Sequence, residues 1–580
     1  MCGIVGFTGK QNAAPILLEG LKKLEYRGYD SAGIAVAQDG VISVSKVSGR
    51  IANLCEKTED GKTLPGFSGI GHTRWATHGA PTDANAHPHM SCDGRFSVVH
   101  NGIIENYMAL REELTANGYT FSSQTDTEVI AHLIEMYYHG DFKEAVMRAT
   151  SRLTGSYALG VLCADCPGKI MAVREASPLI LGIGIGENFF ASDVTALVAY
   201  TRNALYLDDG EFAELTSESI TVYDCTGAVI HKPVSRITWS IEAAEKGGYE
   251  HFMLKEIMEQ PRAVKAALAP RVHESHVQLD DFSFTAEELR SIRKIVITAC
   301  GSAYYAGCAG KYAIEKLCHI PVDVQLASEL RYGEPQIDSD TLLIVLSQSG
   351  ETADTIAAMK ECQSLGARTL AIVNVVGSTI AKLADHTLYT WAGPEIAVAS
   401  TKAYIVQCAT LRLLSLRLGL VHGKMSEDEA RARCAALSQE MPAEISKTLE
   451  LAPQLNGIAR RFKEHEHIFY IGRGVDSHLC TEGSLKLKEI SYIHCEAYAA
   501  GELKHGTISL VEEGTPVVVV ITEDSLAEKT ISGIREVRAR GAHVVCFCAE
   551  AVADHYSIPA DEIVRIPAPS EDAPLPLMTS

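Results

Sequence analysis

The sequence lacks a surplus of basic residues. Its 52 Lys and Arg side chains are outnumbered by 73 Asp and Glu, which gives a formal net charge of -21 and an isoelectric point near 5.5. Nonspecific binding to nucleic acid requires a basic face that neutralises phosphates. The composition therefore argues against nucleic-acid partners, although backbone amides can still bind a small anion locally.

Long apolar runs are also missing. No run approaches the roughly 18 residues that cross a bilayer, and the longest β-like run, Val517 to Ile521, has the length of a strand. No charged segment followed by an apolar one marks a secretory signal. We therefore expect no membrane segment and a cytoplasmic location.

The 16 cysteines show no disulfide framework. In a long chain without a secretory signal, scattered cysteines are expected to be reduced thiols. Cys163-x-x-Cys166 is the single CxxC pattern, and no second pair or histidine pair matches it. We interpret it as structural, and we expect no metal or organic cofactor, because side chains can supply the nucleophile and the proton carriers.

The chain begins with Met1-Cys2-Gly3-Ile4-Val5-Gly6. Removal of Met1 would leave Cys2 with a free α-amine whose pKa of about 8 allows it to accept the thiol proton. An incidental terminal cysteine is the plainer reading. The apolar residues after Gly3 favour a buried strand instead, so Cys2 becomes a candidate nucleophile.

The first third of the chain has the pattern of sheets covered by helices. Apolar residues at helical spacing predict a helix over Asn12 to Leu24. Thr125-Asp126-Thr127-Glu128 predicts a second helix through a capping box. Short strands are expected at Gly33 to Val36, Ile42 to Val47, Phe96 to Val99, Ser156 to Leu162, Ile170 to Val173 and Ser219 to Val222.

Three polar clusters in this region suggest chemistry. Within the block from Gly71 to Gly79, Arg74 could bind a carboxylate through two hydrogen bonds. Asn101 and Gly102 follow a strand and offer the two donors of an oxyanion hole. Asp126 could pair with an ammonium group, although an Asp at a helix start is usually a cap. Together with Cys2 they supply a nucleophile, oxyanion donors and both charges needed to bind an α-amino acid.

These motifs, together with Glu25 to Gly33, resemble class II glutamine amidotransferases and, more narrowly, the family of glutamine:fructose-6-phosphate aminotransferases. The resemblance implies an N-terminal-nucleophile αββα fold, attack of Cys2 on the glutamine amide and an oxyanion hole from Asn101 and Gly102. It further implies that Trp75 gates an ammonia path. The glutamine-binding set it implies is Arg74, Trp75, Thr77, His78 and Asp126.

About two to four domains are expected for 580 residues. Gly247-Gly248 after a charged run indicates a linker, and the segment from Tyr249 to Pro261 resembles the start of the family's synthase half. We predict a glutaminase domain at 1–240, a linker and lead-in at 241–284, and sugar isomerase domains at 285–430 and 455–580.

The second part contains an internal duplication. Six β-branched runs end near Cys300, Ser347, Asn374, Gly472, Thr522 and Cys548, and the spacing within the first three is nearly the same as within the last three. Strands that alternate with helices at these distances predict a doubly wound parallel sheet in each copy. Ligands of such sheets bind at the carboxyl ends of the strands, near helix N-termini.

The loop after Leu346 offers hydroxyls and amides to an anion. Ser347-Gln348-Ser349-Gly350-Glu351-Thr352 begins a helix, and Gly301-Ser302 has the equivalent place after the preceding strand. Ser400 could form a third wall. Ser-rich helix starts are also common as caps. The loops resemble sugar isomerase domains, so phosphosugar binding is implied for Gly301, Ser302, Ser347, Gln348, Ser349, Thr352 and Ser400.

In the second copy, Lys486 and Glu489 are three residues apart, on one helical face. A surface ion pair is the plain alternative. The resemblance implies that Glu489 moves a proton between C1 and C2 of the sugar, with Lys486 beside it. It also implies that His505 assists ring opening from a neighbouring subunit, so we expect a homodimer.

The sequence departs from the family pattern in two respects. Ala303 stands where a hydroxyl residue is common, so a hydrogen bond to the sugar phosphate can be missing. Family members continue into a tail whose lysine forms a Schiff base with fructose 6-phosphate, whereas the last lysine here is Lys529, ahead of Pro567 and Ser580.

The expected reaction is glutamine-dependent conversion of fructose 6-phosphate to glucosamine 6-phosphate and glutamate, with internal transfer of ammonia. An alternative is a glutaminase whose phosphosugar domains bind without synthesis. Amidophosphoribosyltransferase and asparagine synthetase share the Cys2 module. Thr522-Glu523-Asp524-Ser525 only faintly matches the phosphate loop of the former, and the Ser-Gly-Gly-x-Asp-Ser loop of the latter does not occur. A phosphosugar sensor is a further alternative.

Overall fold

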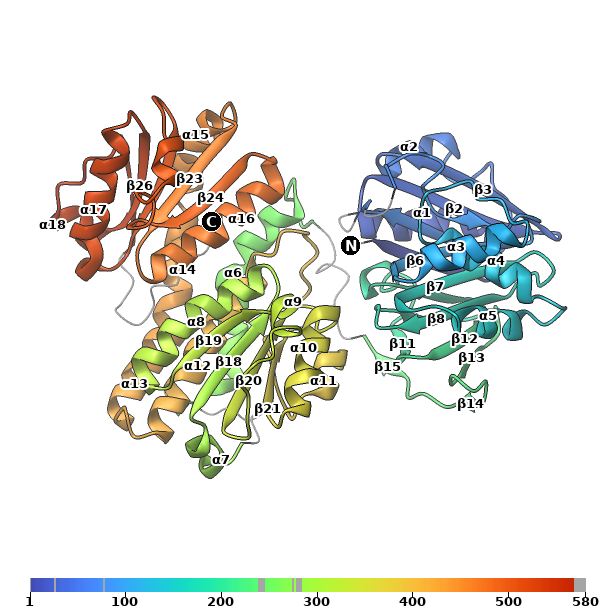
Figure 1. The fold of residues 1–580 in the computed structure, drawn as a ribbon, viewed down its shortest axis with the longest axis horizontal. Coiled ribbons are helices and arrows are strands. Elements are labelled where there is room, and N and C mark those ends of the chain that lie inside the picture. Colours follow the sequence, from blue (N-terminus) through green and yellow to red (C-terminus); the bar gives the residue numbers. More distant parts are fainter. Residues whose placement is uncertain are drawn as a thin grey trace. The chain divides into compact units, whose positions relative to one another are not determined.

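The computed structural model describes residues 2–25, 28–76, 79–237, 246–273, 276–277 and 284–567. The chain forms two compact units, Met1–Glu245 and Lys246–Ser580 (Figure 1). The boundary predicted near residue 240 and the proline-rich tail after Pro567 lie outside the described residues. The predicted domain limits therefore stay predictions.

The first unit contains an eight-stranded antiparallel sheet in the order β15-β11-β9-β10-β1-β4-β2-β3. Strand β1 pairs with β4 on one side and β10 on the other, and all of its residues are buried. The strands are β1 (Gly3–Thr8), β2 (Ser31–Gln38), β3 (Val41–Ser48), β4 (Ser68–Arg74), β9 (Ile180–Ile183), β10 (Asn188–Ala191), β11 (Asn203–Tyr206) and β15 (Ser235–Arg236).

A seven-stranded sheet in the order β14-β13-β12-β8-β7-β6-β5 packs against it. The six strands predicted in the first unit are confirmed as β2, β3 and four strands of this second sheet. Their observed ends differ from the predicted ends by a few residues. The members of this second sheet are β5 (His89–Met90), β6 (Phe96–Ile104), β7 (Gly155–Cys163), β8 (Ile170–Glu175), β12 (Glu211–Leu215), β13 (Ile220–Tyr223) and β14 (Val229–Ile230).

Helices cover the outer face of each sheet. The core between the sheets includes Ile4, Val99 and Phe190, while separate apolar clusters lie under the helices. These four layers confirm the predicted αββα fold. Helices α1 (Ala13–Leu24) and α2 (Ile51–Lys57) cover the eight-stranded sheet, and α3 (Tyr107–Ala116), α4 (Glu128–Tyr137) and α5 (Phe142–Thr150) cover the other; a short 3-10 turn spans Val194–Ala196.

The predicted capping box of α4 is wrong. No side chain caps the N-terminus at Thr127. The Glu128 carboxylate instead accepts hydrogen bonds from the backbone N–H groups of Ser122 and Ser123, both at 2.7 Å. The helix begins at Glu128 and not directly after Thr125, and the preceding loop, in place of a Thr125 cap, binds the Glu128 carboxylate.

The second unit contains two five-stranded parallel sheets, ordered β19-β18-β20-β21-β22 and β24-β23-β25-β26-β27. This confirms the predicted duplication. The strands are β18 (Lys294–Ala299), β19 (Val322–Leu326), β20 (Thr341–Ser347), β21 (Arg368–Val373), β22 (His386–Tyr389), β23 (His467–Gly472), β24 (His494–Ala499), β25 (Pro516–Ile521), β26 (His543–Ala549) and β27 (Glu562–Ile566), with a separate pair β16 (Val272–His273) and β17 (His276–Val277).

Helices surround both sheets, as Figure 1 shows for α8, α10, α16 and α17. They are α6 (Phe252–Leu268), α7 (Ala286–Ser291), α8 (Ser302–Cys318), α9 (Ala327–Leu330), α10 (Ala353–Ser364), α11 (Thr379–Leu383), α12 (Lys402–Val421), α13 (Glu427–Ala435), α14 (Met441–Leu449), α15 (Ala452–Phe462), α16 (Val475–Ser491), α17 (Asp524–Arg538) and α18 (Glu550–His555). Single turns span Ala269–Arg271 and Thr507–Leu510, and a π-helical turn spans Ala436–Glu440.

Helices α8 and α16 are equivalent in the two copies. Each has 17 residues and follows a glycine in the same left-handed conformation, with φ +58° at Gly301 and +59° at Gly474. Only glycine adopts this conformation without strain. Each helix also ends at a left-handed residue, His319 and Tyr492. The duplication therefore extends to the backbone at both helix ends.

Helix α12 is long and apolar enough to cross a membrane, with 20 residues and a mean hydropathy of 1.4. It is the one such helix in the part of the chain that the structure describes. However, 83% of its most apolar stretch is buried, and it packs against α6 and α8. It therefore has the burial of a core helix.

Candidate active site

Cys2 lies directly before β1, beside the end of β4. The antiparallel register places Gly3 opposite Thr73, so the chain before Gly3 approaches Trp75. The Trp75 backbone N–H donates to the Cys2 Sγ over 3.3 Å, and the Trp75 carbonyl oxygen lies 3.6 Å from the same sulfur. A buried central strand therefore fixes the half-buried candidate nucleophile.

The surroundings of Cys2 act on its thiol in opposite directions. Burial raises the pKa of the Cys2 thiol most strongly, and the Asp126 carboxylate adds to this increase. The hydrogen bond from Trp75 and the charge of Arg74 lower the pKa in part. The net pKa lies above that of an ordinary thiol, so nucleophilic attack by Cys2 requires a base.

Asn101 and Gly102 lie on β6, next to Cys2. The Asn101 side-chain Nδ2 donates to the Cys2 carbonyl oxygen over 2.9 Å. Gly102 has φ +132°, and a Cβ there would lie 1.9 Å from the Ser156 carbonyl oxygen of β7. The strand pairing thus requires glycine at position 102 and brings the amide of Asn101 to the nucleophile.

Arg74 and Asp126 provide the two charges near Cys2. Arg74 is buried at the end of β4 and donates from Nη2 to the Gly79 carbonyl oxygen over 3.0 Å. Asp126 is also buried, and its Oδ2 accepts from the Ile104 backbone N–H over 2.9 Å. Trp75 is 38% exposed. Thr77 and His78, the other predicted glutamine-binding residues, lie outside the described residues.

A cluster of buried histidines lies near this site. His72 and His87 stack with ring centroids 4.0 Å apart, and His87 contacts His89 edge to face. Burial lowers the pKa of His72 to about 3, so this imidazole is neutral at physiological pH. Its Nε2 lies 3.0 Å from the His100 carbonyl oxygen on β6. No sequence pattern signalled this packing, because His87 and His89 are distant from His72 in the chain.

In the second unit, the predicted anion site lies at a topological switch point. Strand β18 lies between β19 and β20, so the connections from β18 and from β20 leave in opposite directions. The loops containing Gly301 and Ser347 follow these two neighbouring strands. Open α/β sheets bind ligands at this position.

Internal hydrogen bonds shape the loop after β20. The Ser347 Oγ accepts from the Gly350 N–H over 2.9 Å and lies 3.4 Å from the Thr352 Oγ1. The Ser349 Oγ accepts from the Glu351 N–H over 3.2 Å. These bonds turn the loop into α10 and bring three hydroxyls to one helix start. Gln348 lies in the same loop, where its backbone carbonyl oxygen accepts a hydrogen bond from the Asn374 backbone N–H over 3.1 Å.

Ser400 and Ser302 contact acidic residues. The Ser400 Oγ donates to the Glu395 Oε2 over 2.8 Å. The Ser302 hydroxyl, at the start of α8, lies close enough to the Glu482 carboxylate of α16 to lower its pKa in part. The first copy therefore reaches the second through Ser302.

Helix α16 carries three ionisable residues on one face. The Lys486 Nζ lies 2.9 Å from the Glu489 Oε2 and 3.5 Å from the Glu482 Oε1. Lys486 and Glu482 are buried, whereas Glu489 is half-buried. Burial raises the pKa of Glu482 to about 7, against the opposing effect of Lys486. Sequence reasoning missed Glu482, although its position four residues before Lys486 was a signal.

His505 is exposed in the turn before Thr507–Leu510, and its backbone N–H donates to the Glu502 carbonyl oxygen over 2.9 Å. Although all of these residues are described, the His505 side chain forms no hydrogen bond or ion pair with Glu482, Lys486 or Glu489. The predicted catalytic set of the second unit is thus assembled in part: Lys486 and Glu489 are in contact, and His505 is separate from them.

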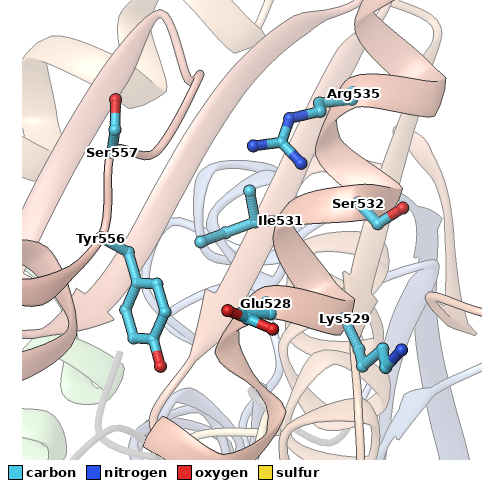
Figure 2. Close-up of a pocket in the computed structure, with 7 residues that line it drawn as sticks. All are labelled: Glu528, Lys529, Ile531, Ser532, Arg535, Tyr556 and Ser557. Carbon is cyan, nitrogen blue, oxygen red and sulfur yellow. The ribbon is translucent and has the colours of Figure 1, made fainter.

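A cavity of about 460 Å³ lies beside α17. Figure 2 shows Tyr556 and Ser557 facing Glu528, Ile531 and Arg535 of this helix. Its lining in the described part of the chain includes none of the predicted site residues. We therefore keep the candidate sites at Cys2 and at the switch point.

Comparisons with known proteins agree with both units. A glutamine amidotransferase domain model matches residues 72–199, and a SIS domain model matches 288–417 and 461–580. The chain is 52% identical over 568 residues to glutamine:fructose-6-phosphate aminotransferase (isomerizing) of Caldanaerobacter subterraneus subsp. tengcongensis, covering 98% of this chain and 93% of the relative. A relative of the same name from Clostridium tetani is 53% identical over 549 residues, 94% of this chain and 90% of that one.

A solved structure resembles the second unit. It is the C-terminal domain of glucosamine-fructose-6-phosphate aminotransferase from Francisella tularensis, with a TM-score of 0.56 and 35% identity. The match covers 58% of this chain and 96% of that one. The sequence comparison and the structural comparison therefore both point to fructose-6-phosphate aminotransferases.

Proposed function

The chain belongs to the family of glutamine:fructose-6-phosphate aminotransferases (isomerizing), and on this premise we propose how its residues perform the reaction. The reaction transfers the amide nitrogen of glutamine to fructose 6-phosphate and yields glucosamine 6-phosphate and glutamate. The observation that carries this function is the identity of 52% over 98% of the chain, which includes both units.

In the first unit, the Cys2 thiolate attacks the amide carbon of glutamine. The C–N bond breaks, ammonia leaves, and water then hydrolyses the thioester to glutamate. The raised pKa of Cys2 requires a base, and the α-amine exposed by removal of Met1 can accept the proton. The location of Asn101 at 2.9 Å from the Cys2 carbonyl supports an oxyanion hole of Asn101 and Gly102.

Substrate recognition in the first unit uses opposite charges. Arg74 binds the α-carboxylate of glutamine and Asp126 binds its ammonium group. The electrostatic effect that both residues have on Cys2 supports their closeness to the reacting atoms. Thr77 and His78 complete the pocket, and the exposed Trp75, adjacent to the sulfur, gates the passage of ammonia.

In the second unit, the loops at the switch point bind the sugar phosphate. Hydroxyls and backbone N–H groups at the starts of α8 and α10 neutralise the anion. Glu489 moves the proton between C1 and C2, and Lys486 keeps this carboxylate oriented and charged. His505 assists ring opening from a second copy, as the family resemblance implies.

Competing functions are less well supported. The comparisons do not favour a glutaminase that only binds phosphosugars, because relatives named for the complete reaction align with 98% of this chain. Domain models and relatives also do not point to amidophosphoribosyltransferase or asparagine synthetase. We further propose a homodimer in the cytoplasm, which the soluble fold permits.

The test is an assay of both half-reactions on the full chain. The wild type is expected to form glucosamine 6-phosphate from glutamine and fructose 6-phosphate. Cys2→Ala is expected to lower glutamate release on the order of 10⁴-fold or more, because the covalent step is lost. Added ammonia is expected to restore amino-sugar formation in this variant, because the second unit is unchanged.

Cys225→Ala is the matched control, since Cys225 is an exposed cysteine of the same unit. It is expected to retain both activities. Glutamate release by Cys2→Ala at the wild-type rate would refute the nucleophile, and no amino sugar from the wild type would refute the overall function.

A further inference from the structure

A second cluster of reactive side chains lies in the first unit, apart from Cys2. Cys92 is exposed in the turn between β5 and β6, and His132 and Glu135 lie on α4. One nitrogen of His132, the Cys92 sulfur and one carboxylate oxygen of Glu135 all lie within 4.8 Å of one another. In the part of the chain that the structure describes, this is the one group of three or more His, Cys, Asp and Glu side chains with such spacing.

The spacing fits the ligands of a tetrahedral metal ion. Zinc lies about 2.3 Å from sulfur and about 2.1 Å from nitrogen or oxygen, so its ligand atoms are about 3.4–3.6 Å apart. The Cys92 Sγ lies 3.7 Å from the His132 Nδ1, and this nitrogen lies 3.9 Å from the Glu135 Oε2. Shifts of a few tenths of an ångström would bring these two pairs of atoms to coordination distance, and the sulfur lies within 4.8 Å of the carboxylate oxygen.

A carboxylate stands behind the histidine, as in most zinc sites. The His132 Nε2 lies 3.8 Å from the Glu128 Oε1, and both side chains are buried. Binding of a metal to Nδ1 would place the ring proton on Nε2, which faces this carboxylate. Carboxylate partners of this kind orient metal-binding histidines and make them more basic.

The Cys92 sulfur lies against the backbone of Thr120. The Thr120 backbone N–H donates to the Cys92 Sγ over 3.4 Å, and the Thr120 carbonyl oxygen lies at the same distance from the sulfur. Asp93, the other acidic neighbour, is engaged by Ser91 and Arg95 and does not compete for the metal. Cys92 is exposed, so a metal ion can enter from solvent and water can complete the coordination.

We propose that Cys92, His132 and Glu135 bind a zinc ion that joins the β5–β6 turn to helix α4. One thiolate, one imidazole and one carboxylate in tetrahedral spacing favour zinc over magnesium or calcium, which prefer oxygen ligands. Binding releases the thiol proton to solvent. The site is separate from the chemistry at Cys2, and its role is structural: Glu128, behind the histidine, also binds the segment of Ser122 and Ser123 that leads to Asp126.

The test measures metal binding by the full-length protein after removal of bound metal with a chelator. The wild type is expected to bind one more zinc ion per chain than Cys92→Ser, and to release a proton on binding. With Co²⁺, the wild type is expected to show thiolate-to-metal charge-transfer absorption and tetrahedral d–d bands. Cys92→Ser is expected to lose the charge-transfer band and to bind metal at least about 100-fold more weakly.

Two further variants sharpen the test. Cys225→Ser, another exposed cysteine of the same unit, is expected to keep the wild-type stoichiometry and spectrum. His132→Gln is expected to lose the metal site. Because His132 is buried, this variant can fail to fold, and Cys92→Ser, a change at an exposed position, then tests the proposal. Zinc is also expected to raise the melting temperature of the wild type and not that of Cys92→Ser.

Equal zinc content in the wild type and Cys92→Ser would overturn the proposal. The same conclusion would follow from identical cobalt spectra of the two proteins, or from wild-type binding that occurs only at millimolar zinc. Cys2 is present in the wild type and in every variant. Metal bound at Cys2 would therefore contribute equally to all of them and would not change the difference in zinc content between the wild type and Cys92→Ser.

Discussion

The carbonyl of Cys2 and the side chain of Asn101 are joined by a hydrogen bond across two sheets. This contact holds the residue that carries the nucleophile against the strand that carries the oxyanion donors. An oxyanion donor is effective only if it is fixed before the reaction begins. The structural contact and the proposed catalytic role of Asn101 therefore depend on the same amide.

Replacement of this amide is a test at the residue scale. Asn101→Ala is expected to lower kcat for glutamine hydrolysis about 10²–10³-fold, the usual loss for one oxyanion donor. The KM for glutamine is expected to change little, because the charges on Arg74 and Asp126 remain. Steady-state measurement of glutamate release separates the two parameters.

Asn117→Ala is a suitable control, since Asn117 is an exposed residue after α3. It is expected to leave kcat and KM unchanged. A variant at Asn101 with wild-type kcat would exclude this amide from the transition state.

At the scale of single elements, α16 places Glu482, Lys486 and Glu489 on one face. Lys486 contacts both carboxylates, and the Ser302 hydroxyl of α8 favours the charged form of Glu482. Because Glu482 is 5% exposed, burial penalises its charged form more than these partners favour it. This helix therefore contains an acid that titrates near physiological pH.

The raised pKa of Glu482 gives stability a pH dependence. The folded state, with a pKa of about 7, binds the proton more tightly than an ordinary carboxyl of pKa 4.5. The contribution of Glu482 is thus fully present below about pH 4.5 and is lost as pH rises through 7. Glu482→Gln is expected to reduce the slope of unfolding free energy with pH between these values by up to about 1.4 kcal/mol per unit.

The measurement is thermal unfolding of the variant and wild type between about pH 5 and pH 7. The slope is reduced and not abolished, because burial also raises the pKa of Glu256 to about 7 and that of Asp476 to about 6. Glu464→Gln, at a largely exposed position, is the control. If the unfolding free energies of Glu482→Gln and the wild type changed with pH in the same way, the titration of buried Glu482 would be contradicted.

Element-scale features were predictable where the sequence pattern is strong. The six β-branched runs of the second unit became the buried strands β18, β20, β21, β23, β25 and β26, since continuous apolar runs mark strands covered on both faces. Strands β19, β22, β24 and β27 were missed. They are short edge strands that include polar or half-buried residues and lack a continuous apolar run.

The candidate sites were predictable to a similar extent. Cys2, Asn101, Ser347 and Lys486 were singled out as candidates because motifs mark them in the sequence. The contact of Ser302 with Glu482 was not, because it joins positions 180 residues apart through tertiary packing. The prediction of the α4 cap failed for a related reason. The backbone N–H groups of Ser122 and Ser123 bind the Glu128 carboxylate, which the predicted capping box had assigned to Thr125.

At the scale of the whole molecule, each buried apolar cluster of the described residues lies within one unit. Three buried clusters are formed by residues up to Ile237, and four others by residues from Ala263 onward. Each unit thus has the buried apolar surface that independent folding requires.

A divided chain is expected to retain its separate activities. A fragment of residues 1–245 is expected to fold and to hydrolyse glutamine, because Cys2, Asn101 and Asp126 all belong to it. A fragment of residues 246–580 is expected to fold and to bind fructose 6-phosphate. Calorimetry of each fragment, together with a glutamate assay of the first, measures both properties.

The full chain is the reference for this experiment. It is expected to show the two unfolding transitions of the fragments at closely similar temperatures. A fragment of residues 1–245 without a cooperative transition would show that its cores depend on the other unit.

The pairing of α8 with α16 has a consequence for the origin of this architecture. These equivalent helices pack against each other, as the same surface of two identical proteins does across a twofold axis. Once a gene encodes both copies in tandem, such a contact is no longer bound by symmetry. Each side can then diverge, which explains how one helix begins among hydroxyls while its counterpart carries an ammonium group and two acids.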